Sequence, residues 1–457
     1  MARGKKTAKE LTPEEKLAQA LVPVEEQPYQ VPENWCWTYM NRVAQWGSGG
    51  TPSRKNPEYY KGYIPWIKTG ELNDGYVYDT EEKITDEAIA CSSAKIFPAN
   101  TIAIAMYGAT IGKVGILGME AATNQACACG ICLEALAYKF LFYYARSQKG
   151  AFIGKAKGGA QPNISQEIIK THFIPLPPLA EQQRIVDRIE SIFAKLDEAK
   201  EKAQEVVDGF EMRKSAILHK AFTGELTKKW REEQGVTKES WENRNLQSVC
   251  SLKITDGTHK TPIYCDADEG IPFISAKDVT TGRIYWDNIK YIIPELHEEL
   301  YERLAPQLDD ILLAKNGTTG VAAIVEEEKI FDLYVTLAVL RPNKEIIIPR
   351  YLLNIVNSPI CKNQFDEHLT GIGVPNLHLR DIRKVVITVP TLAEQKEIVR
   401  LLDQIIEKSQ QAKESAGAVI EQIDAMKKAV LARAFRGELG TNDPKEESSV
   451  ELLKEIL

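Results

Sequence analysis

The sequence has no long hydrophobic run, few histidines and no segment with the pattern expected of a secretion signal. No uncharged apolar segment approaches the ~20 residues that cross a bilayer. The N-terminus is basic, but no apolar segment follows it, which is unlike a signal peptide. We therefore expect a cytoplasmic protein that does not contact membranes. The six histidines are scattered, without the spacing of a zinc site.

The motifs of common enzymes are also missing. Residues 108–114 (GATIGKV) are one residue too short for a phosphate-binding P-loop and lack its hydroxyl. The prolines Pro177 and Pro178 follow a leucine, whereas an amino-methyltransferase motif places Asn or Asp there. Residues 327–329 (EEK) resemble a nuclease metal site only loosely and are more simply a solvated turn. We expect no catalytic residue, cofactor or metal on this chain.

The formal net charge is -7, a modest acidic excess. This balance argues against a protein that coats nucleic acid nonspecifically, although local basic loops remain compatible with a sequence reader. The acidic residues concentrate in the predicted long helices and in the C-terminal tail.

What the sequence does contain is one segment twice. Residues 162–226 and 375–439 align without a gap at a constant offset of 213. Both copies share Pro-Asn, Leu-Ala-Glu-Gln and Ala-Phe-x-Gly-Glu-Leu. The segments upstream align more loosely, for example Thr51-Pro52 with Thr261-Pro262. A repeat of this length indicates a duplicated fold.

The repeat also explains the cysteines. Three of the eight lie close together as Cys127, Cys129 and Cys132, but no second cluster follows. The second copy has Leu337 and Val339 at the first two of these positions. We therefore interpret them as buried strand residues, neither metal ligands nor disulfides.

Each copy predicts one long helix of about 40 residues, or roughly 60 Å. A capping box at Thr391 and Glu394 starts the second helix, and Gly224 and Gly437 end the two helices. The apolar positions follow a coiled-coil spacing, which predicts that the two helices pair with each other; packing of the stripes on their own domains is the alternative. The predicted seam is Ile185, Ile189, Ile192, Leu196, Val206, Phe210, Ile398, Leu402, Ile405, Val419 and Ile423.

The predicted fold class is α+β: two mixed α/β domains separated by two long helices, with pseudo-two-fold internal symmetry. Strands are expected at 76–78, 101–107, 284–286 and 310–314, and helices at 135–147 and 349–357. The predicted boundaries are 1–30 for an N-terminal charged segment, 31–175 for the first domain, 176–226 for the first helix, 227–388 for a charged linker and the second domain, 389–440 for the second helix, and 441–457 for an acidic tail.

Both domains contain polar loops with donors that suit DNA. Any one of these residues alone is more simply a solvated loop residue, but together they favour a DNA interface. The first domain contributes Ser53, Arg54, Lys55, Lys68, Thr69, Lys155, Lys157, Gln161 and Asn163. The second contributes Thr258, His259, Lys260, Lys277, Lys315, Asn316, Thr318, Thr319 and His378.

With these motifs the chain resembles the DNA-specificity subunits of type I restriction-modification systems. The resemblance covers essentially the whole chain and rests on the helix starts at 174–183 and 389–395, the two helix ends, and residues 65–70, 107–113 and 124–126. The second domain departs from the pattern at 315–320 and 332–335, which leaves its base preference open.

The resemblance implies two target-recognition domains that each read half of a bipartite, asymmetric site in double-stranded DNA. An antiparallel coiled coil of the two long helices would hold these domains apart. Two modification subunits with S-adenosylmethionine would dock on the helices and methylate adenine, and restriction subunits with ATP and magnesium would join them. The chain itself would be non-catalytic. Equal helices predict one spacer, of roughly 5–8 base pairs between half-sites.

Two other classes of function stay open. A self-contained methyltransferase or nuclease would need a cofactor or metal motif and would bind S-adenosylmethionine by itself. A coiled-coil scaffold with protein-binding domains would show no salt-dependent DNA binding.

Overall fold

The computed structural model describes residues 12–157, 162–279, 282–369 and 375–457, and it divides the chain into two compact units. The first unit joins the chain up to Lys202 with Val419–Leu457, and the second is Ala203–Ala418. Each unit therefore contains one α/β domain, part of the first long helix and part of the second. The boundaries expected from the sequence treated each helix as a separate segment, whereas the contacts divide each helix between the units.

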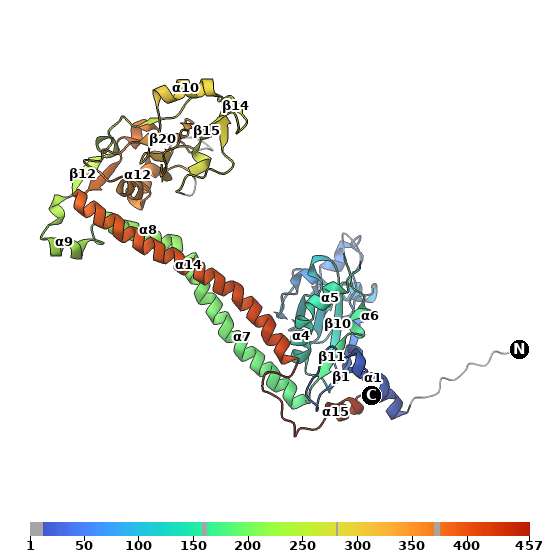
Figure 1. The fold of residues 1–457 in the computed structure, drawn as a ribbon. Helices are drawn as coiled ribbons and strands as arrows, with labels where there is room; N and C mark the ends of the chain where they lie inside the picture. The colour runs from blue at the N-terminus through green and yellow to red at the C-terminus, as the bar shows by residue number, and fades with distance from the viewer. Residues whose placement is uncertain (1–11, 158–161, 280–281, 370–374) are drawn as a thin grey trace. The chain divides into compact units, whose positions relative to one another are not determined.

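The first domain is built from three small sheets (Figure 1). A five-stranded sheet has the order β2-β10-β7-β8-β4, a four-stranded sheet the order β5-β3-β9-β6, and β1 pairs with β11. The strands are β1 (Cys36–Tyr39), β2 (Ala44–Ser48), β3 (Ile64–Ile67), β4 (Tyr76–Val77), β5 (Lys83–Ile84), β6 (Ile96–Phe97), β7 (Ile102–Ala105), β8 (Val114–Leu117), β9 (Ala121–Thr123), β10 (Cys127–Cys132) and β11 (Phe173–Leu176).

The helices of the first unit pack on this domain and include both ends of the described chain. They are α1 (Pro13–Ala20), α2 (Met40–Val43), α3 (Asp86–Ala90), α4 (Tyr138–Ser147), α5 (Lys149–Gly154), α6 (Gln166–Lys170), α15 (Ser449–Glu455), and the adjoining parts of α7 (Leu179–Asp208) and α14 (Leu392–Ala434). Ala20 of α1 and Leu453 of α15 are fully buried in one core. The regions expected to be a charged segment and an acidic tail thus belong to the packed unit, because their few apolar residues face inward.

The second domain repeats this plan. Its sheets have the orders β13-β20-β17-β18, β14-β16-β15-β19 and β12-β21. The strands are β12 (Glu242–Asn245), β13 (Thr255–Asp256), β14 (Tyr264–Cys265), β15 (Ile271–Ile274), β16 (Lys290–Ile292), β17 (Ile311–Ala314), β18 (Ala322–Ile324), β19 (Asp332–Leu333), β20 (Leu337–Leu340) and β21 (Val386–Val389). The helices are α8 (Phe210–Phe222), α9 (Lys228–Gln234), α10 (Pro294–Arg303), α11 (Pro349–Val356), α12 (Pro359–Glu367) and α13 (Leu379–Ile382).

Strand register confirms the duplication beyond the gapless segment. Ser48 pairs with Ala128 in the first domain, and Asp256 pairs with Ala338 in the second. The strand prediction for the cysteines is also confirmed, since Cys127 and Cys129 lie in β10 with no exposed surface. Burial raises the pKa of the Cys129 thiol to about 12.

Most predicted strands and helices are present, but residues 284–286 form no strand. In this segment the Trp286 ring packs edge-on against Phe331, with centroids 5.4 Å apart, and Lys329 lies over it at 4.2 Å. The β-branched and aromatic residues that suggested a strand therefore belong to a loop that packs against the core. Within the described residues, no helix is long and apolar enough to span a membrane.

The first long helix is interrupted, whereas the second is continuous. Gly209 separates α7 from α8, and the equivalent position in α14 is Gln422. Glycine loses more conformational entropy than other residues in a helix, which favours the break at this position. The prediction of one uninterrupted helix is wrong for the first copy.

The apolar stripe of the helices is buried mainly where it meets a domain. Ile185 and Ile189 are fully buried in the core of the first domain, as Ile398 and Leu402 are in the second. Val419, expected on the seam, is 41% exposed. Packing of the apolar stripe on the domain, the alternative to a coiled coil, therefore accounts for the burial at the start of each long helix. Among the other predicted seam residues, Phe210 and Ile423 are buried. Ile192, Leu196, Val206 and Ile405 are half-buried.

Within the first unit, α7 and α14 run antiparallel. Lys200 of α7 forms an ion pair with Asp424 of α14 at 3.0 Å. Asp197, three residues earlier in α7, pairs with Lys427, which is three residues later in α14. The pairs are exposed on at least one side, so they contribute little stability, but their opposite sequence order identifies the direction of the two helices.

Candidate nucleic-acid interface

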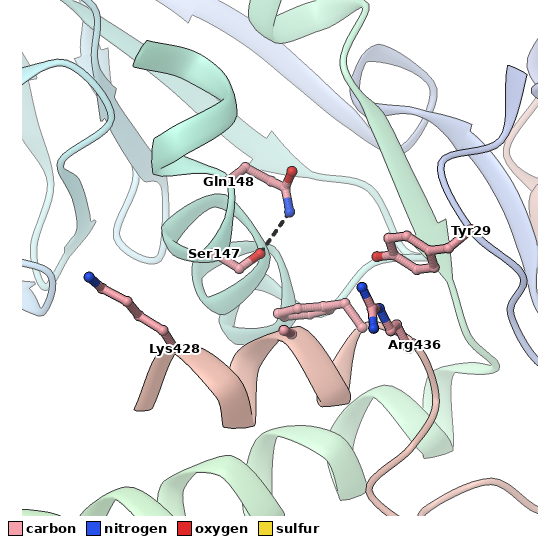
Figure 2. Close-up of a pocket in the computed structure, with 7 residues that line it drawn as sticks. Tyr29, Ser147, Gln148, Lys428 and Arg436 are labelled. Carbon is pink, nitrogen blue, oxygen red and sulfur yellow. Dashed lines mark hydrogen bonds between the residues drawn. The ribbon is translucent and has the colours of Figure 1, made fainter. Parts of the chain in front are cut away.

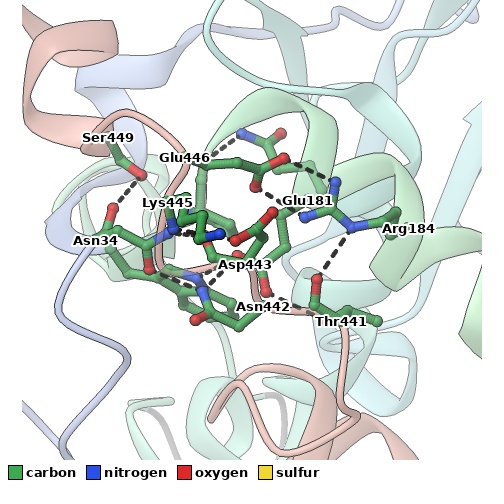
Figure 3. Close-up of polar contacts among 12 residues, drawn as sticks. Asn34, Glu181, Arg184, Thr441, Asn442, Asp443, Lys445, Glu446 and Ser449 are labelled. Carbon is green, nitrogen blue, oxygen red and sulfur yellow. Dashed lines mark hydrogen bonds and ion pairs between the residues drawn. The ribbon is translucent and has the colours of Figure 1, made fainter.

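A buried glutamate at the start of each long helix fastens it to its domain. In the first unit, Glu181 is fully buried and accepts hydrogen bonds from the Trp35 indole at 2.7 Å and the Asn442 amide at 2.9 Å (Figure 3). Thr441 also donates to it, at 3.3 Å. The neighbouring Arg184 forms a two-pronged bond with Glu446 at 2.8 Å. The segment that follows α14 therefore closes over the start of α7.

The second unit repeats this arrangement with a different charge balance. Glu394 is fully buried and accepts from Trp241 at 2.9 Å and from Thr227 at 2.7 Å. Its third partner is the guanidinium of Arg231, at 2.5 Å, on α9. The residues that the sequence suggested as a charged linker thus form a helix with a buried arginine. The Glu394 side chain is used here and does not complete the predicted capping box; only the Thr391 hydroxyl accepts from the helix, at 3.4 Å.

The glutamine that follows each glutamate makes the same contacts in both units. Gln182 accepts from the Ala137 N–H at 2.8 Å and donates to the Ala135 and Pro177 carbonyls at 2.9 and 3.0 Å. Gln395 accepts from the Ile348 N–H and donates to two carbonyls at 2.8–2.9 Å. Because buried backbone groups need partners, the repeated Glu-Gln pair is explained by attachment of helix to domain.

At one edge of each central sheet, a strand end meets the Pro-Asn segment of the repeat. In the first domain Tyr107 bridges to Asn163, and the Gly108 N–H donates to the Pro162 carbonyl at 2.9 Å. In the second domain Asn316 bridges to Asn376 in the same way. This turn brings the predicted residues Lys157, Asn163 and Asn316 to equivalent edges, with Lys157 paired to Asn163 through its backbone.

A second loop reaches the neighbouring sheet by a close backbone approach. A Cβ on Gly49 would lie 2.0 Å from the Thr123 carbonyl, and one on Gly257 would lie 2.0 Å from that of Leu333. Only glycine fits at either position. The predicted contact residues Ser53, Lys55 and His259 follow these glycines and are exposed.

Two predicted DNA ligands of the first domain are held by carboxylates. Arg54 forms two hydrogen bonds to Glu82, at 2.5 and 3.2 Å, and its guanidinium lies 4.1 Å from the Tyr60 ring centroid. Lys68 pairs with Glu81 at 2.8 Å and with Glu82 at 3.1 Å. The hydrogen bond from Arg54 lowers the pKa of the Glu82 carboxyl, so this cluster stays ionised.

The remaining predicted DNA-contact residues of the first domain differ in exposure. Thr69 is half-buried, Lys155 is exposed with its ammonium 3.3 Å from Nδ1 of His172, and Gln161 lies outside the described residues. Burial lowers the pKa of His172 to about 4, with the charge of Lys155 as a smaller cause. His172 was not predicted to be functional, and it is a buried polar residue.

In the second domain, two of the predicted DNA-contact residues are buried. Thr258 is 4% exposed, and Lys315 is 7% exposed in an ion pair with Asp256 at 2.8 Å. Sequence reasoning missed Asp256 because an acidic residue is not a typical DNA ligand. Four other predicted residues of this domain are exposed: Lys260, Lys277, Thr318 and His378, of which His378 caps a helix. Lys260 forms an ion pair with Glu299, and the Lys277 ammonium lies 4.0 Å from the Asp278 carboxylate. Asn316 and Thr319 are half-buried.

Sequence reasoning also left Gln125 and Tyr107 out of its candidate set. Gln125 is exposed and hydrogen-bonded to the Thr51 hydroxyl, and Tyr107 is 46% exposed at the strand end. Both lie in motifs on which the family resemblance rests, which was the available signal.

A cavity of about 130 Å³ lies in the first unit where α14 meets α4 (Figure 2). Its walls include Tyr29, Ser147, Gln148, Lys428 and Arg436, with the two cations at opposite ends. Ligand pockets for cofactor-sized molecules begin at roughly 300 Å³, so this cavity is too small for a nucleotide cofactor. Among the described residues, no group of three His, Cys, Asp or Glu side chains could hold a metal ion.

Two copies of one α/β domain, each fastened to long helices and each with polar loops at the same sheet edge, define a duplicated binding protein. The chain belongs to the family described as type I restriction modification DNA specificity domain, whose model matches residues 32–207 and again 238–422. Both copies of the repeat are therefore members of the same domain family.

Curated relatives extend over most of the chain. The EcoKI specificity subunit of Escherichia coli K12 is 23% identical over 425 residues, 90% of each chain. The MjaVIII specificity subunit of Methanocaldococcus jannaschii is 26% identical over 90% of this chain and 94% of the relative. The match to the EcoBI specificity subunit of Escherichia coli, at 25% identity, spans 61% of this chain and 60% of the relative.

Solved structures show the same fold. The HsdS subunit from Thermoanaerobacter tengcongensis is similar with a TM-score of 0.62 and 19% identity, covering 91% of this chain and all of that chain. A chain from a study of assembly of the type I R-M system gives a TM-score of 0.65 at 19% identity, over 90% of this chain and all of the other.

Proposed function

We propose that this chain is the DNA-specificity subunit of a type I restriction-modification enzyme. Its two domains read the two halves of a bipartite, asymmetric site in double-stranded DNA. The observation that supports this most directly is that the family match covers both copies of the domain, each with polar loops at the equivalent sheet edge. The loops differ in sequence between the copies, which favours two different half-sites.

In this proposal the chain does no chemistry. Modification subunits with S-adenosylmethionine would methylate adenine, and restriction subunits would use ATP and magnesium. The subunits would assemble on the long helices, in the cytoplasm. The relatives are named as subunits of restriction enzymes, which supports an assembly of this kind.

The test is to produce the chain with the modification subunits of the same system and to map methylated adenines in the host genome. We expect one bipartite motif with two dissimilar halves, and binding of duplexes carrying that motif that weakens as salt increases. Methylation without sequence preference, or a motif that persists when the gene is deleted, would overturn the proposal.

A second assay separates the alternatives. The purified chain alone should neither bind labelled S-adenosylmethionine nor turn over DNA or ATP. Cofactor binding by the lone chain would favour a self-contained enzyme. An assembled complex without salt-dependent DNA binding would instead favour a protein scaffold.

A further inference from the structure

The second domain has an ionic cluster at positions where the first domain has uncharged residues. The cluster consists of Asp256, His259 and Lys315. Strand register identifies Ser48 and Met106 of the first domain as the equivalents of Asp256 and Lys315. The residue that follows a shared backbone hydrogen bond, donated by Gly50 or Thr258, is Thr51 in the first domain and His259 in the second, and the second loop is two residues longer before the aligned Thr261-Pro262. The cluster is thus a property of one copy and not of the fold.

Asp256 is shared by the other two residues. Its Oδ1 lies 3.3 Å from Nε2 of His259, and its Oδ2 lies 2.8 Å from Nζ of Lys315. The Asp256 and Lys315 side chains are 6% and 9% exposed, whereas that of His259 is 71% exposed. The cluster therefore consists of a buried pair of a carboxylate and an ammonium group, and an exposed imidazole.

A contribution to the stability of the fold does not explain why these three residues lie together. Removing two charges from water costs about as much as their attraction returns, so a buried ion pair is weak evidence for stabilisation. The first domain builds the same sheet edge with a serine and a methionine. The ion pair is better explained by what it does to His259.

A carboxylate accepts hydrogen bonds, so Asp256 selects the form of His259 with the proton on Nε2. In the neutral ring, Nδ1 is then a hydrogen-bond acceptor directed away from Asp256. In the major groove, the base groups that donate are the exocyclic amino groups of adenine and cytosine. Lys315 neutralises Asp256, so the carboxylate does not repel the phosphates nearby.

We propose that His259, held by Asp256 and Lys315, reads an exocyclic amino group of adenine or cytosine in the half-site of the second domain. Asp256 and Lys315 are positioning residues, and His259 is the residue that determines specificity. This inference rests on the proposed function, and it assigns one base contact to one domain.

The test uses the complex of the full chain with its modification subunits. In duplexes carrying the mapped site, each adenine is replaced in turn by purine and each cytosine by 2-pyrimidinone, which removes the amino group alone. At the position that His259 reads, we expect the wild-type complex to lose about 5- to 150-fold in affinity; losses at other positions report other contacts. In His259→Thr, which installs the first-domain residue, this position should become insensitive while the others keep their wild-type losses.

The double variant Asp256→Ser with Lys315→Met separates positioning from folding. It installs the residues that the first domain uses at these places, so it should fold, and its first-domain half-site should be read normally. We expect the same loss of sensitivity at the His259 position as in His259→Thr. Wild-type sensitivity in this double variant would overturn the positioning role.

The controls separate the possible failures. His368→Ala alters an exposed histidine of the same domain, at the C-terminal end of α12 and outside the predicted contact set, and should leave the amino-group sensitivity unchanged. If His259→Thr retains the full wild-type loss at every position, His259 reads no amino group and the inference is wrong. A wild-type complex without any sequence preference would instead contradict the proposed function itself.

Discussion

In each unit, a glutamate and the glutamine that follows it attach the start of a long helix to the domain. The two units differ in the residues that donate hydrogen bonds to the buried glutamate. The hydrogen-bond donors to Glu181 in the described part of the first unit are uncharged, whereas Glu394 accepts from the guanidinium of Arg231. The repeated geometry shows that the position and direction of the acceptor matter. The source of the compensating donors is free to change, because an amide or a guanidinium can each satisfy the buried oxygens.

The largest expected effect tests that difference. Glu394→Gln leaves the buried Arg231 charge without its carboxylate, so it should destabilise the second unit by about 3–5 kcal/mol. Glu181→Gln loses hydrogen bonds from neutral donors and should cost the first unit about 1–3 kcal/mol. Equilibrium denaturation combined with hydrogen exchange in each unit measures both. Equal losses would show that the arginine is not the distinguishing feature, and Glu198→Gln, on the exposed surface of α7, is the neutral control.

The next effect depends on pH and on one unit alone. His172 is buried with its pKa lowered from 6.5 to about 4, and the equivalent residue of the second unit is Val385. Below pH 6.5 the unfolded chain binds a proton that the folded unit refuses, so stability falls as the pH decreases towards 4, by about 3 kcal/mol in total. The substitution His172→Val should remove this contribution. Identical slopes of stability against pH for wild type and variant would contradict the assignment.

A smaller effect separates two adjacent cations of the first domain. In the described part of the chain Lys55 is exposed without an ion pair, whereas Arg54 is held by Glu82 and stacked on Tyr60. Lys55→Ala should lower the salt slope of DNA binding by about one and weaken all sequences alike. Arg54→Ala should instead reduce the stability of the loop and leave the slope unchanged. The reverse result would mean that Arg54 leaves Glu82 on binding.

The smallest effect concerns the helix interruption. Gln422 occupies the position in α14 at which Gly209 separates α7 from α8. Gln422→Gly should destabilise α14 by about 0.5–1 kcal/mol. Calorimetry of the variant measures the change, with Gln422→Ala as a control that should be neutral. A larger loss would indicate a tertiary contact of Gln422.

Local sequence patterns were sufficient for the framework. The gapless repeat predicted the duplication, and alternation or helical spacing predicted β7, β10, α4 and α11. These predictions succeed because each depends on residues that are close in the sequence. The strand expected at 284–286 failed for the opposite reason, since Trp286 takes its role from Phe331 on a distant segment.

Charge pairing was beyond sequence reasoning. Arg54, Lys68 and Lys315 were selected as DNA ligands by residue type, but each faces a carboxylate in the fold. Lys55 and Lys157 carry the same chemistry and are exposed. Nothing in the local sequence distinguishes these two groups, because the partner of Lys315, Asp256, comes from a strand far back in the chain.

The sequence by itself determined that the chain is a tandem of one domain and one helix, that both copies have the same motifs, and to which family they belong. The tertiary structure decided that each domain closes on the start of one long helix and the end of the other, and which glutamate is neutralised by an arginine. Glu394 and Arg231 are 163 residues apart. Their pairing follows from desolvation of the carboxylate, which only the packed unit imposes.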